Sequence, residues 1–194
     1  MKLDTDMEKR ASKVDKDKNE TGWMSLIKGV THDNPRKLRG LRMNSIYFEE
    51  AGSDPVLEKT YLQAEALVRT GGKRMGSRYV QGTGGESGAA LAAMNKMFFN
   101  PETYKILPYK NTYGESGQVQ YTGFFIPAYT MWFGDDEGNK GFDSRGVVYE
   151  DKAKAYFIKT FNETKDPQAL IITRAEFCFT PEDAFILEGS NRFD

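Results

Sequence analysis

The chain has 194 residues with 28 acidic and 27 basic side chains, so a formal net charge of −1 gives no overall attraction to nucleic acid. Its 39% hydrophobic and 13% aromatic content is enough for the core of one domain. No apolar stretch approaches the roughly 18 residues that predict a membrane span, and no apolar signal-peptide core follows the first residues. One Cys and one His exclude an intramolecular disulfide and a histidine-rich metal site.

The first part of the chain is dominated by charge. Residues 1–22 are rich in Lys, Asp and Glu and poor in apolar residues, a composition that predicts disorder. We expect order to begin near Trp23, where residues 23–29 (WMSLIKG) predict a strand that runs into a turn. Residues 36–42 (RKLRGLR) follow, and their four charges have a solvated surface as the simplest reading.

A short apolar run ends in two adjacent carboxylates. Residues 46–48 (IYF) have the pattern of a buried strand, so Glu49 and Glu50 would emerge at its carboxyl end, where ligands bind in open α/β sheets. P-loop ATPases present a Mg²⁺ ligand and a water-activating group in this way. A solvated strand end is the alternative reading of the two acids.

An amphipathic helix is predicted next, over residues 57–68. Asp54 and Pro55 form an N-cap and first-turn pair before it, and Gly71 and Gly72 end it. A helix in this place can connect two parallel strands of one sheet.

The second strand of that unit is predicted at residues 78–81 (RYVQ), followed by the glycine-rich segment 82–85 (GTGG). A right-handed strand–helix–strand unit places both strand tips on one edge of the sheet. We therefore expect Thr83 to face the same crevice as Glu49 and Glu50. A structural turn before the next helix would explain the glycines equally well.

The second half of the chain is predicted to be mixed. Its expected helices cover 87–99, 147–161 and 167–177, its expected strands cover 104–109 and 123–133, and residues 135–141 form an exposed acidic loop. Thr180, Pro181 and Asp183 have the spacing of a capping box at the start of a further helix. Cys178, among aromatic residues, is expected to be a structural thiol and not a nucleophile.

Six segments, in this order, resemble the large terminase subunit of tailed bacteriophages, the ATPase-nuclease that packs DNA into capsids. They are residues 34–40 (NPRKLRG), 45–50 (SIYFEE), 82–85 (GTGG), 98–101 (FFNP), 123–129 (GFFIPAY) and 179–185 (FTPEDAF). The second resembles the second acidic motif of the family's ATPase, the third its coupling motif, and the last the segment that leads out of the ATPase domain. Together they extend over most of the chain.

The resemblance implies an α/β fold, the C-terminal part of a RecA-like P-loop ATPase sheet with peripheral strands and helices. It implies ATP and Mg²⁺ as cofactors of the complete enzyme, with Glu49 holding the metal through water and Glu50 orienting the attacking water. Many members carry Asp at the first position, so the two acids could exchange these roles. Gly82, Thr83 and Gly84 would sense the γ-phosphate and pass its loss to the DNA-gripping surface.

The family also implies an arginine finger. An arginine about ten residues before the acidic pair reaches the ATP of the neighbouring subunit, and Arg39 is the candidate for this role. The planar guanidinium suits the task because its fixed donors stabilise charge that develops on the γ-phosphate. Arg42 and a plain surface role for Arg39 are the alternatives.

Two parts of the family are not found in the sequence. The Walker A pattern, Gly-x-x-x-x-Gly-Lys-Ser/Thr, does not occur in residues 1–44, and residues 71–77 (GGKRMGS) resemble it only superficially, since their order is wrong and they follow the acidic pair. We expect a basic turn there. The nuclease domain would follow residue 194, so we expect the chain to correspond to the middle of a terminase and to be inactive as an ATPase alone.

The expected organisation has a charged N-terminal segment, a partial ATPase domain, and the helical end of that domain with a linker toward the nuclease. These parts correspond to residues 1–22, 23–146 and 147–194. Implied partners are double-stranded DNA, the portal protein and procapsid, and the small terminase subunit, in a homo-oligomeric ring in the cytoplasm of the bacterial host, without a membrane.

Two other functions agree with the same motifs. One is an inactive product of a split or decayed gene that acts only as an interaction module. The other is a related helicase-type ATPase, whose acidic and Thr-containing motifs follow the same order. Residues 98–101 and 179–185 argue against the helicase.

Overall fold

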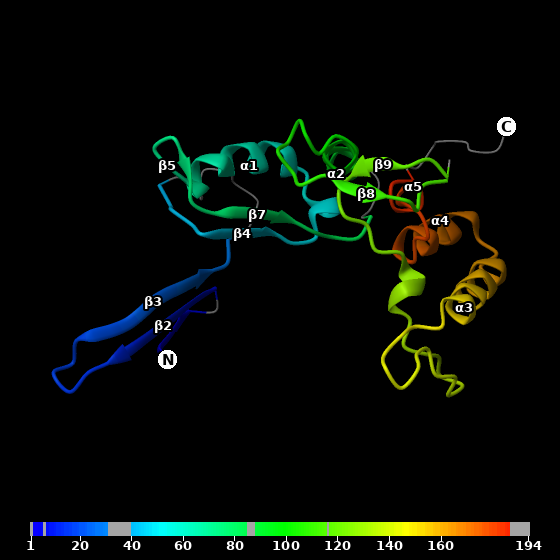
Figure 1. Ribbon diagram of the computed structural model, residues 1–194, viewed down its shortest axis with the longest axis horizontal. Helices are drawn as coiled ribbons and strands as arrows, with labels where there is room; N and C mark the ends of the chain where they lie inside the picture. The colour runs from blue at the N-terminus through cyan, green and yellow to red at the C-terminus, as the bar shows by residue number, and fades with distance from the viewer. Residues whose placement is uncertain (1, 6, 31–39, 85–87, 116, 187–194) are drawn as a thin grey trace.

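The computed structural model describes residues 2–5, 7–30, 40–84, 88–115 and 117–186, which form a mixed α/β fold with several small sheets (Figure 1). The strands are β1 (Lys2–Thr5), β2 (Glu8–Val14), β3 (Glu20–Lys28), β4 (Ser45–Phe48), β5 (Arg69–Thr70), β6 (Lys73–Arg74), β7 (Ser77–Val80), β8 (Tyr109–Asn111) and β9 (Gln120–Thr122). The α-helices are α1 (Leu57–Ala64), α2 (Ala89–Phe99), α3 (Glu150–Glu163), α4 (Pro167–Glu176) and α5 (Pro181–Ala184). The 3₁₀ helices are η2 (Ala51–Ser53), η3 (Glu65–Val68) and η4 (Ala128–Met131).

The centre of the fold is a parallel strand pair. β4 and β7 pair from Ser45 opposite Ser77 to Phe48 opposite Val80, and α1 connects them along the chain. This confirms the predicted strand–helix–strand unit. Ile46 and Phe48 alternate inward and are buried, as expected for strand residues that pack beneath a helix.

The connecting helix is shorter than the sequence pattern predicts. Asp54 is not its N-cap. The Asp54 carboxylate accepts a hydrogen bond from the Val56 amide at 2.9 Å, and Val56 is the N-cap of α1, which begins at Leu57. The helix ends at Ala64 and continues as η3 to Val68. The chain must then turn into the β5–β6 hairpin, which leads back to β7.

The main core lies between β4, β7, α1 and α2. Its buried members are Ile46, Phe48, Ala51, Leu57, Tyr61, Ala64, Leu67, Val68, Met97 and Tyr104. Tyr61 connects α1 to the turn after α2, because its hydroxyl donates a hydrogen bond to the carbonyl of Tyr104 at 3.0 Å. The core therefore holds the parallel pair against the helices on one face.

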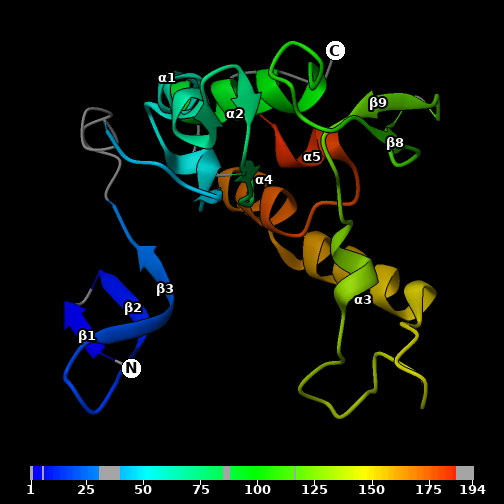
Figure 2. The same cartoon turned by 60° about the vertical axis from the view of Figure 1, so that its left-hand side comes forward.

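The N-terminal region differs from the predicted disordered segment. β1, β2 and β3 form an antiparallel sheet, which Figures 1 and 2 show apart from the helices. Two ion pairs connect β2 and β3, with Arg10 3.7 Å from Glu20 and Lys28 3.7 Å from Glu8. Asp15 closes the β2–β3 turn by accepting two backbone amides. The high charge density of this segment therefore does not prevent strand pairing, and two cross-strand ion pairs support it.

The strands predicted at 104–109 and 123–133 are wrong. In the first range residues 104–105 form a turn, residues 106–108 are irregular and Tyr109 already belongs to β8, which pairs with β9 across a later loop. Much of the second range is irregular or belongs to η4, and Tyr129 in η4 and Trp132 just after it pack into an aromatic cluster with α3. Aromatic residues favour strands in general, but here Tyr104, Phe125, Tyr129 and Trp132 are buried from turns and irregular segments.

The C-terminal helices agree with the prediction. α3 and α4 lie within three residues of the expected bounds, and α2 ends at Phe99 before Asn100 as expected. The capping box at the start of α5 is confirmed, since the Thr180 hydroxyl accepts the Asp183 amide and the Asp183 carboxylate accepts the Thr180 amide, both at 3.2 Å. None of the described helices has the length and apolar character to cross a membrane.

Candidate functional site

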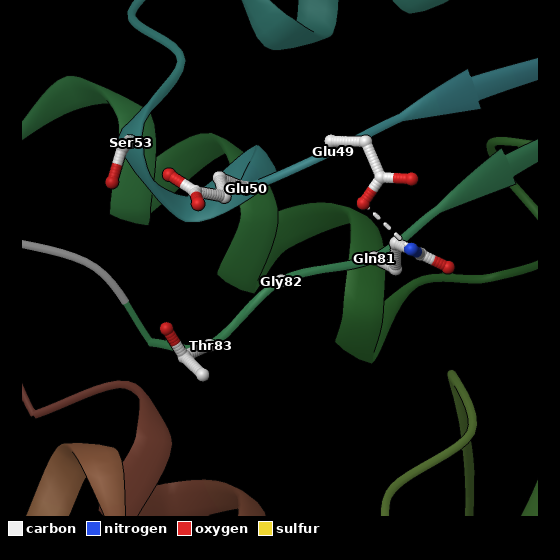
Figure 3. A pocket seen from close by; sticks show the side chains of 6 residues that line it. All are labelled: Glu49, Glu50, Ser53, Gln81, Gly82 and Thr83. Carbon is white, nitrogen blue, oxygen red and sulfur yellow. Dashed lines mark hydrogen bonds between the residues drawn. The ribbon is translucent and has the colours of Figure 1, made fainter.

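A hollow of about 300 Å³ lies at the carboxyl ends of β4 and β7 (Figure 3). It is lined by Glu49, Glu50, Ser53, Gln81, Gly82 and Thr83. Backbone hydrogen bonds continue the strand pairing beyond the strand ends, because the Gln81 amide donates to Phe48 and the Ala51 amide donates to Gln81, each at 3.0 Å. The acidic segment and the glycine-rich segment are therefore held side by side, as the sequence predicts.

Glu49 is oriented by a side chain of the neighbouring strand. Gln81 Nε2 donates a hydrogen bond to Glu49 Oε2 at 2.7 Å, shown dashed in Figure 3. Both residues follow directly after the last paired positions of their strands, Phe48 and Val80. Gln81 had no predicted role, although the parallel register alone places it beside Glu49.

Glu50 has an unusual backbone conformation. Its φ of 47° and ψ of 45° lie in the left-handed region, which costs a residue with a Cβ roughly 1–2 kcal/mol. The Glu50 carbonyl accepts the Ser53 amide at 2.9 Å, which closes the turn of η2. Figure 3 shows the Glu50 carboxylate on the side of Ser53, whereas the Glu49 carboxylate turns towards Gln81. The two acids therefore have separate surroundings, as two different roles would require.

The glycines beside Thr83 are needed for close approach. A Cβ at Gly82 would lie 2.8 Å from the Ala51 amide nitrogen, and one at Gly84 would overlap the Ala184 carbonyl oxygen. Backbone atoms on both sides cannot move aside as a flexible side chain could. The segment thus fits between η2 and α5 only with glycine, and it presents the exposed Thr83 to the hollow.

The predicted arginines are not brought to this hollow within the described residues. Arg39 lies outside them. Arg42 is described, but it precedes the opposite end of β4, where the Met43 amide donates to the Leu67 carbonyl at 3.0 Å. The arginine-finger role stays a prediction.

The hollow offers oxygen ligands. Two carboxylates and the hydroxyls of Ser53 and Thr83 surround it, and oxygen donors are what Mg²⁺ prefers. Among the described residues no group of three or more His, Cys, Asp or Glu could hold a metal alone. The two acids nevertheless fit Mg²⁺ as nucleotide enzymes bind it, through one or two carboxylates together with substrate phosphates.

Cys178 has no part in this chemistry. Burial raises the pKa of its thiol to about 11, so the thiol is protonated at neutral pH and a poor nucleophile. Its half-buried side chain packs against the cluster of Leu91, Phe125 and Phe185. This agrees with the predicted structural role.

Comparison with protein-family models, with curated proteins and with solved structures finds no match to this chain. The fold defines a mixed α/β protein whose candidate site joins two carboxylates and a glycine-rich segment. Its function is therefore argued from the geometry of the hollow and from the sequence motifs.

Proposed function

We propose that this chain carries the acidic and coupling motifs of a DNA-packaging ATPase of the large-terminase type, and that β4 and β7 belong to a RecA-like sheet. One observation carries the proposal: Glu49 and Glu50 line the same hollow as Gly82 and Thr83, at the carboxyl ends of neighbouring parallel strands. Open α/β sheets bind their ligands at this edge. The two motifs that the family requires thus support a single nucleotide site.

The geometry suggests a separate role for each of these residues in ATP hydrolysis. Glu49, oriented by Gln81, would bind a water of the Mg²⁺ shell, and Glu50 would orient the attacking water. Bound Mg²⁺ would neutralise charge on the phosphoryl oxygens. Thr83 would contact the γ-phosphate end of the nucleotide and transmit its loss, because it lines the hollow from a segment packed against α5.

The proposed enzyme needs a phosphate-binding loop from outside this sequence. No Walker A pattern occurs in the chain, and two carboxylates repel a polyphosphate unless a metal and a cradle of donors accompany it. We propose that the complete machine works as a ring with the portal protein, procapsid and small terminase subunit, and moves double-stranded DNA in the host cytoplasm. The chain alone should release no phosphate from ATP above background.

The test uses an enzyme completed with the Walker A segment of a matching terminase, in one chain or as a complementing fragment. Glu50→Gln keeps the size of the side chain and removes its charge. ATP binding should survive, and hydrolysis should fall about 10²–10⁴-fold, the range of lost general-base chemistry. Phosphate release and nucleotide binding are measured together.

Glu102→Gln is the matched control, because Glu102 is an exposed acid in a turn and does not line the hollow. It should hydrolyse ATP at the unaltered rate. Substantial turnover by Glu50→Gln would refute the role of Glu50, and equal losses in both variants would refute the site.

A further inference from the structure

Three arginines converge on one carboxylate at the β5–β6 hairpin. Glu65 accepts Arg69 Nε at 2.6 Å, Arg74 Nη2 at 3.2 Å and Arg78 Nη2 at 2.6 Å. Burial alone would raise the pKa of Glu65, but the hydrogen bond from Arg69 and the charges of Arg78 and Arg74 outweigh burial and lower it. Glu65 is therefore ionised at neutral pH and balances only one of these positive charges.

The sequence leaves the other charges without acids nearby along the chain. Residues 66–85 contain Arg69, Lys73, Arg74 and Arg78 and no Asp or Glu. With Glu65 included, this segment has four positive charges and one negative charge, in a chain whose formal net charge is −1. Since the molecule has no overall attraction to nucleic acid, any such contact must come from a local excess of this kind.

Arg78 organises the cluster from inside the fold. Its side chain is only 2% exposed and lies over the Tyr61 ring, with Cζ 3.9 Å from the ring centroid. Arg78 Nη1 also donates to the Tyr61 carbonyl at 2.7 Å. The positive charge of the buried Arg78 neutralises the Glu65 carboxylate. The positive charges nearer the surface are therefore left in excess.

Arg69 and Arg74 lie closer to solvent, with side chains 33% and 39% exposed, and Lys73 is exposed between them. Arg69 Nη1 donates to the Gly72 carbonyl at 3.1 Å and so fixes the hairpin turn. Within the described part of the chain Arg74 uses only Nη2, so its Nε and Nη1 donors are available to a ligand.

The hairpin lies at the end of the parallel pair opposite to the candidate nucleotide site. The Met75 and Gly76 amides donate to the Val68 carbonyl just before β7 begins, whereas the hollow follows its last residue. Figure 1 shows β5 beyond the amino ends of β4 and β7. The exposed Arg42 precedes β4 at this same end. These cations therefore do not serve the hollow of their own chain.

We propose that Arg42, Lys73 and Arg74 form a binding surface for phosphate groups of the double-stranded DNA backbone. The surface rests on the proposed function for the identity of its partner, and on the excess charge for its chemistry. Guanidinium and ammonium groups bind phosphate without reading base sequence, which suits a protein that must move along any DNA.

The test is fluorescence anisotropy of the full chain with a labelled duplex of mixed sequence, without nucleotide, between about 50 and 200 mM salt. The variant Lys73→Gln/Arg74→Gln removes two cations. The slope of log affinity against log salt should become shallower by about 1.8, since each lost phosphate contact contributes about 0.9. The single variant Lys73→Gln, which leaves the Glu65 network intact, should change it by about half as much.

Lys140→Gln/Arg145→Gln is the matched control, because it removes the same charge from exposed positions of the loop before α3. It should bind DNA like the unaltered chain. The proposal is overturned if the unaltered chain binds no duplex, if the control and test variants weaken binding equally, or if Lys73→Gln leaves the slope unchanged.

A second arm distinguishes DNA phosphates from nucleotide phosphates. Mg·ATP at about the concentration of duplex phosphate should displace little DNA, because a single nucleotide releases few counterions. Complete displacement, lost in Lys73→Gln/Arg74→Gln, would assign the surface to nucleotides and overturn the proposal. The anisotropy titration contains no ATP, so a failure of DNA binding in it leaves the hydrolysis proposal intact. A completed enzyme without ATP hydrolysis would likewise leave the DNA-binding result intact.

Discussion

Glu50 combines a strained backbone with a proposed catalytic carboxylate. A left-handed glutamate is uncommon, and such residues persist where the surrounding structure fixes them. Here the Ala51 and Ser53 amides on either side of the turn are both hydrogen-bonded, to Gln81 and to Glu50 itself. The left-handed conformation is therefore held in place by the hydrogen bonds of this turn.

Replacing Glu50 should separate stability from activity. Glu50→Gly removes the Cβ that makes the left-handed conformation costly, whereas Glu50→Ala retains it. We expect the glycine variant to be more stable than the alanine variant by about 1 kcal/mol, although both lose the carboxylate. Urea denaturation of the two chains measures the difference. An alanine variant of equal or greater stability would show that the conformation is not strained.

Thr83 is expected to fail differently from Glu50. In the completed enzyme, Thr83→Ala should retain nucleotide binding and lower DNA translocation more than ATP consumption, because coupling depends on a differential contact between two states. The ratio of DNA moved to phosphate released measures this. Thr103→Ala, at an exposed turn position, is the control. Equal losses of hydrolysis and translocation would remove the coupling role.

The sequence predicts part of the site because the order strand, helix, strand indicates two parallel strands whose carboxyl ends lie at the same edge. Apolar residues before Glu49 and before Gly82, with a helix between, suffice to bring the two tips together. The hydrogen bond from Gln81, the left-handed Glu50 and the convergence of arginines on Glu65 are not readable. They depend on register and on a hairpin whose strands have only two residues each.

At the scale of elements, prediction succeeded where a helix has clear ends. Pro167 after Asp166 marks the start of α4, and the Asp166 carboxylate accepts the Ala169 amide at 2.7 Å. It failed where aromatic residues pack from turns, as Tyr104 does, because strand propensity cannot distinguish a pleated surface from a buried turn. It also failed in the N-terminal sheet, where composition hid the pairing.

Asp183 should be the most sensitive acid of the C-terminal helices. It is 4% exposed and accepts Arg174 Nη2 at 2.6 Å and the Phe179 and Thr180 amides at 3.2 Å. Asp183→Ala should cost about 2–3 kcal/mol, because three donors lose a buried charged acceptor. Chemical denaturation gives the free energy of unfolding.

Asp136→Ala provides the comparison, since Asp136 is an exposed loop acid whose loss should change stability by less than about 0.5 kcal/mol. Similar costs for the two variants would mean that the capping box and ion pair contribute little.

At the scale of the whole molecule, the described chain has an N-terminal sheet and a larger helical part. The three hydrophobic clusters found in the described residues draw on residues 41 to 185 and on none of the β2 and β3 side chains whose burial is described. Figures 1 and 2 show the sheet to one side of β4 and β7. These clusters of the larger part therefore form without those side chains of the sheet.

Removal of residues 1–30 should leave the unfolding of the larger part nearly unchanged. We expect a shift in Tm below about 2 °C, equivalent to less than about 1 kcal/mol for a chain of this size. Differential scanning calorimetry of the full and shortened chains measures it. A markedly lower Tm would show that β1 to β3 stabilise the core.

The members of the ion-pair network around Glu65 should differ in how well the protein tolerates their substitution. Either Arg69 or Arg74 can be replaced, because the two remaining guanidinium groups still neutralise the Glu65 carboxylate. Loss of Glu65 instead strands the buried Arg78 without its counter-ion, which is far more costly. Exchange of Arg74 should therefore alter how the hairpin binds a ligand without unfolding it, whereas exchange of the acid beneath the arginines should not be tolerated.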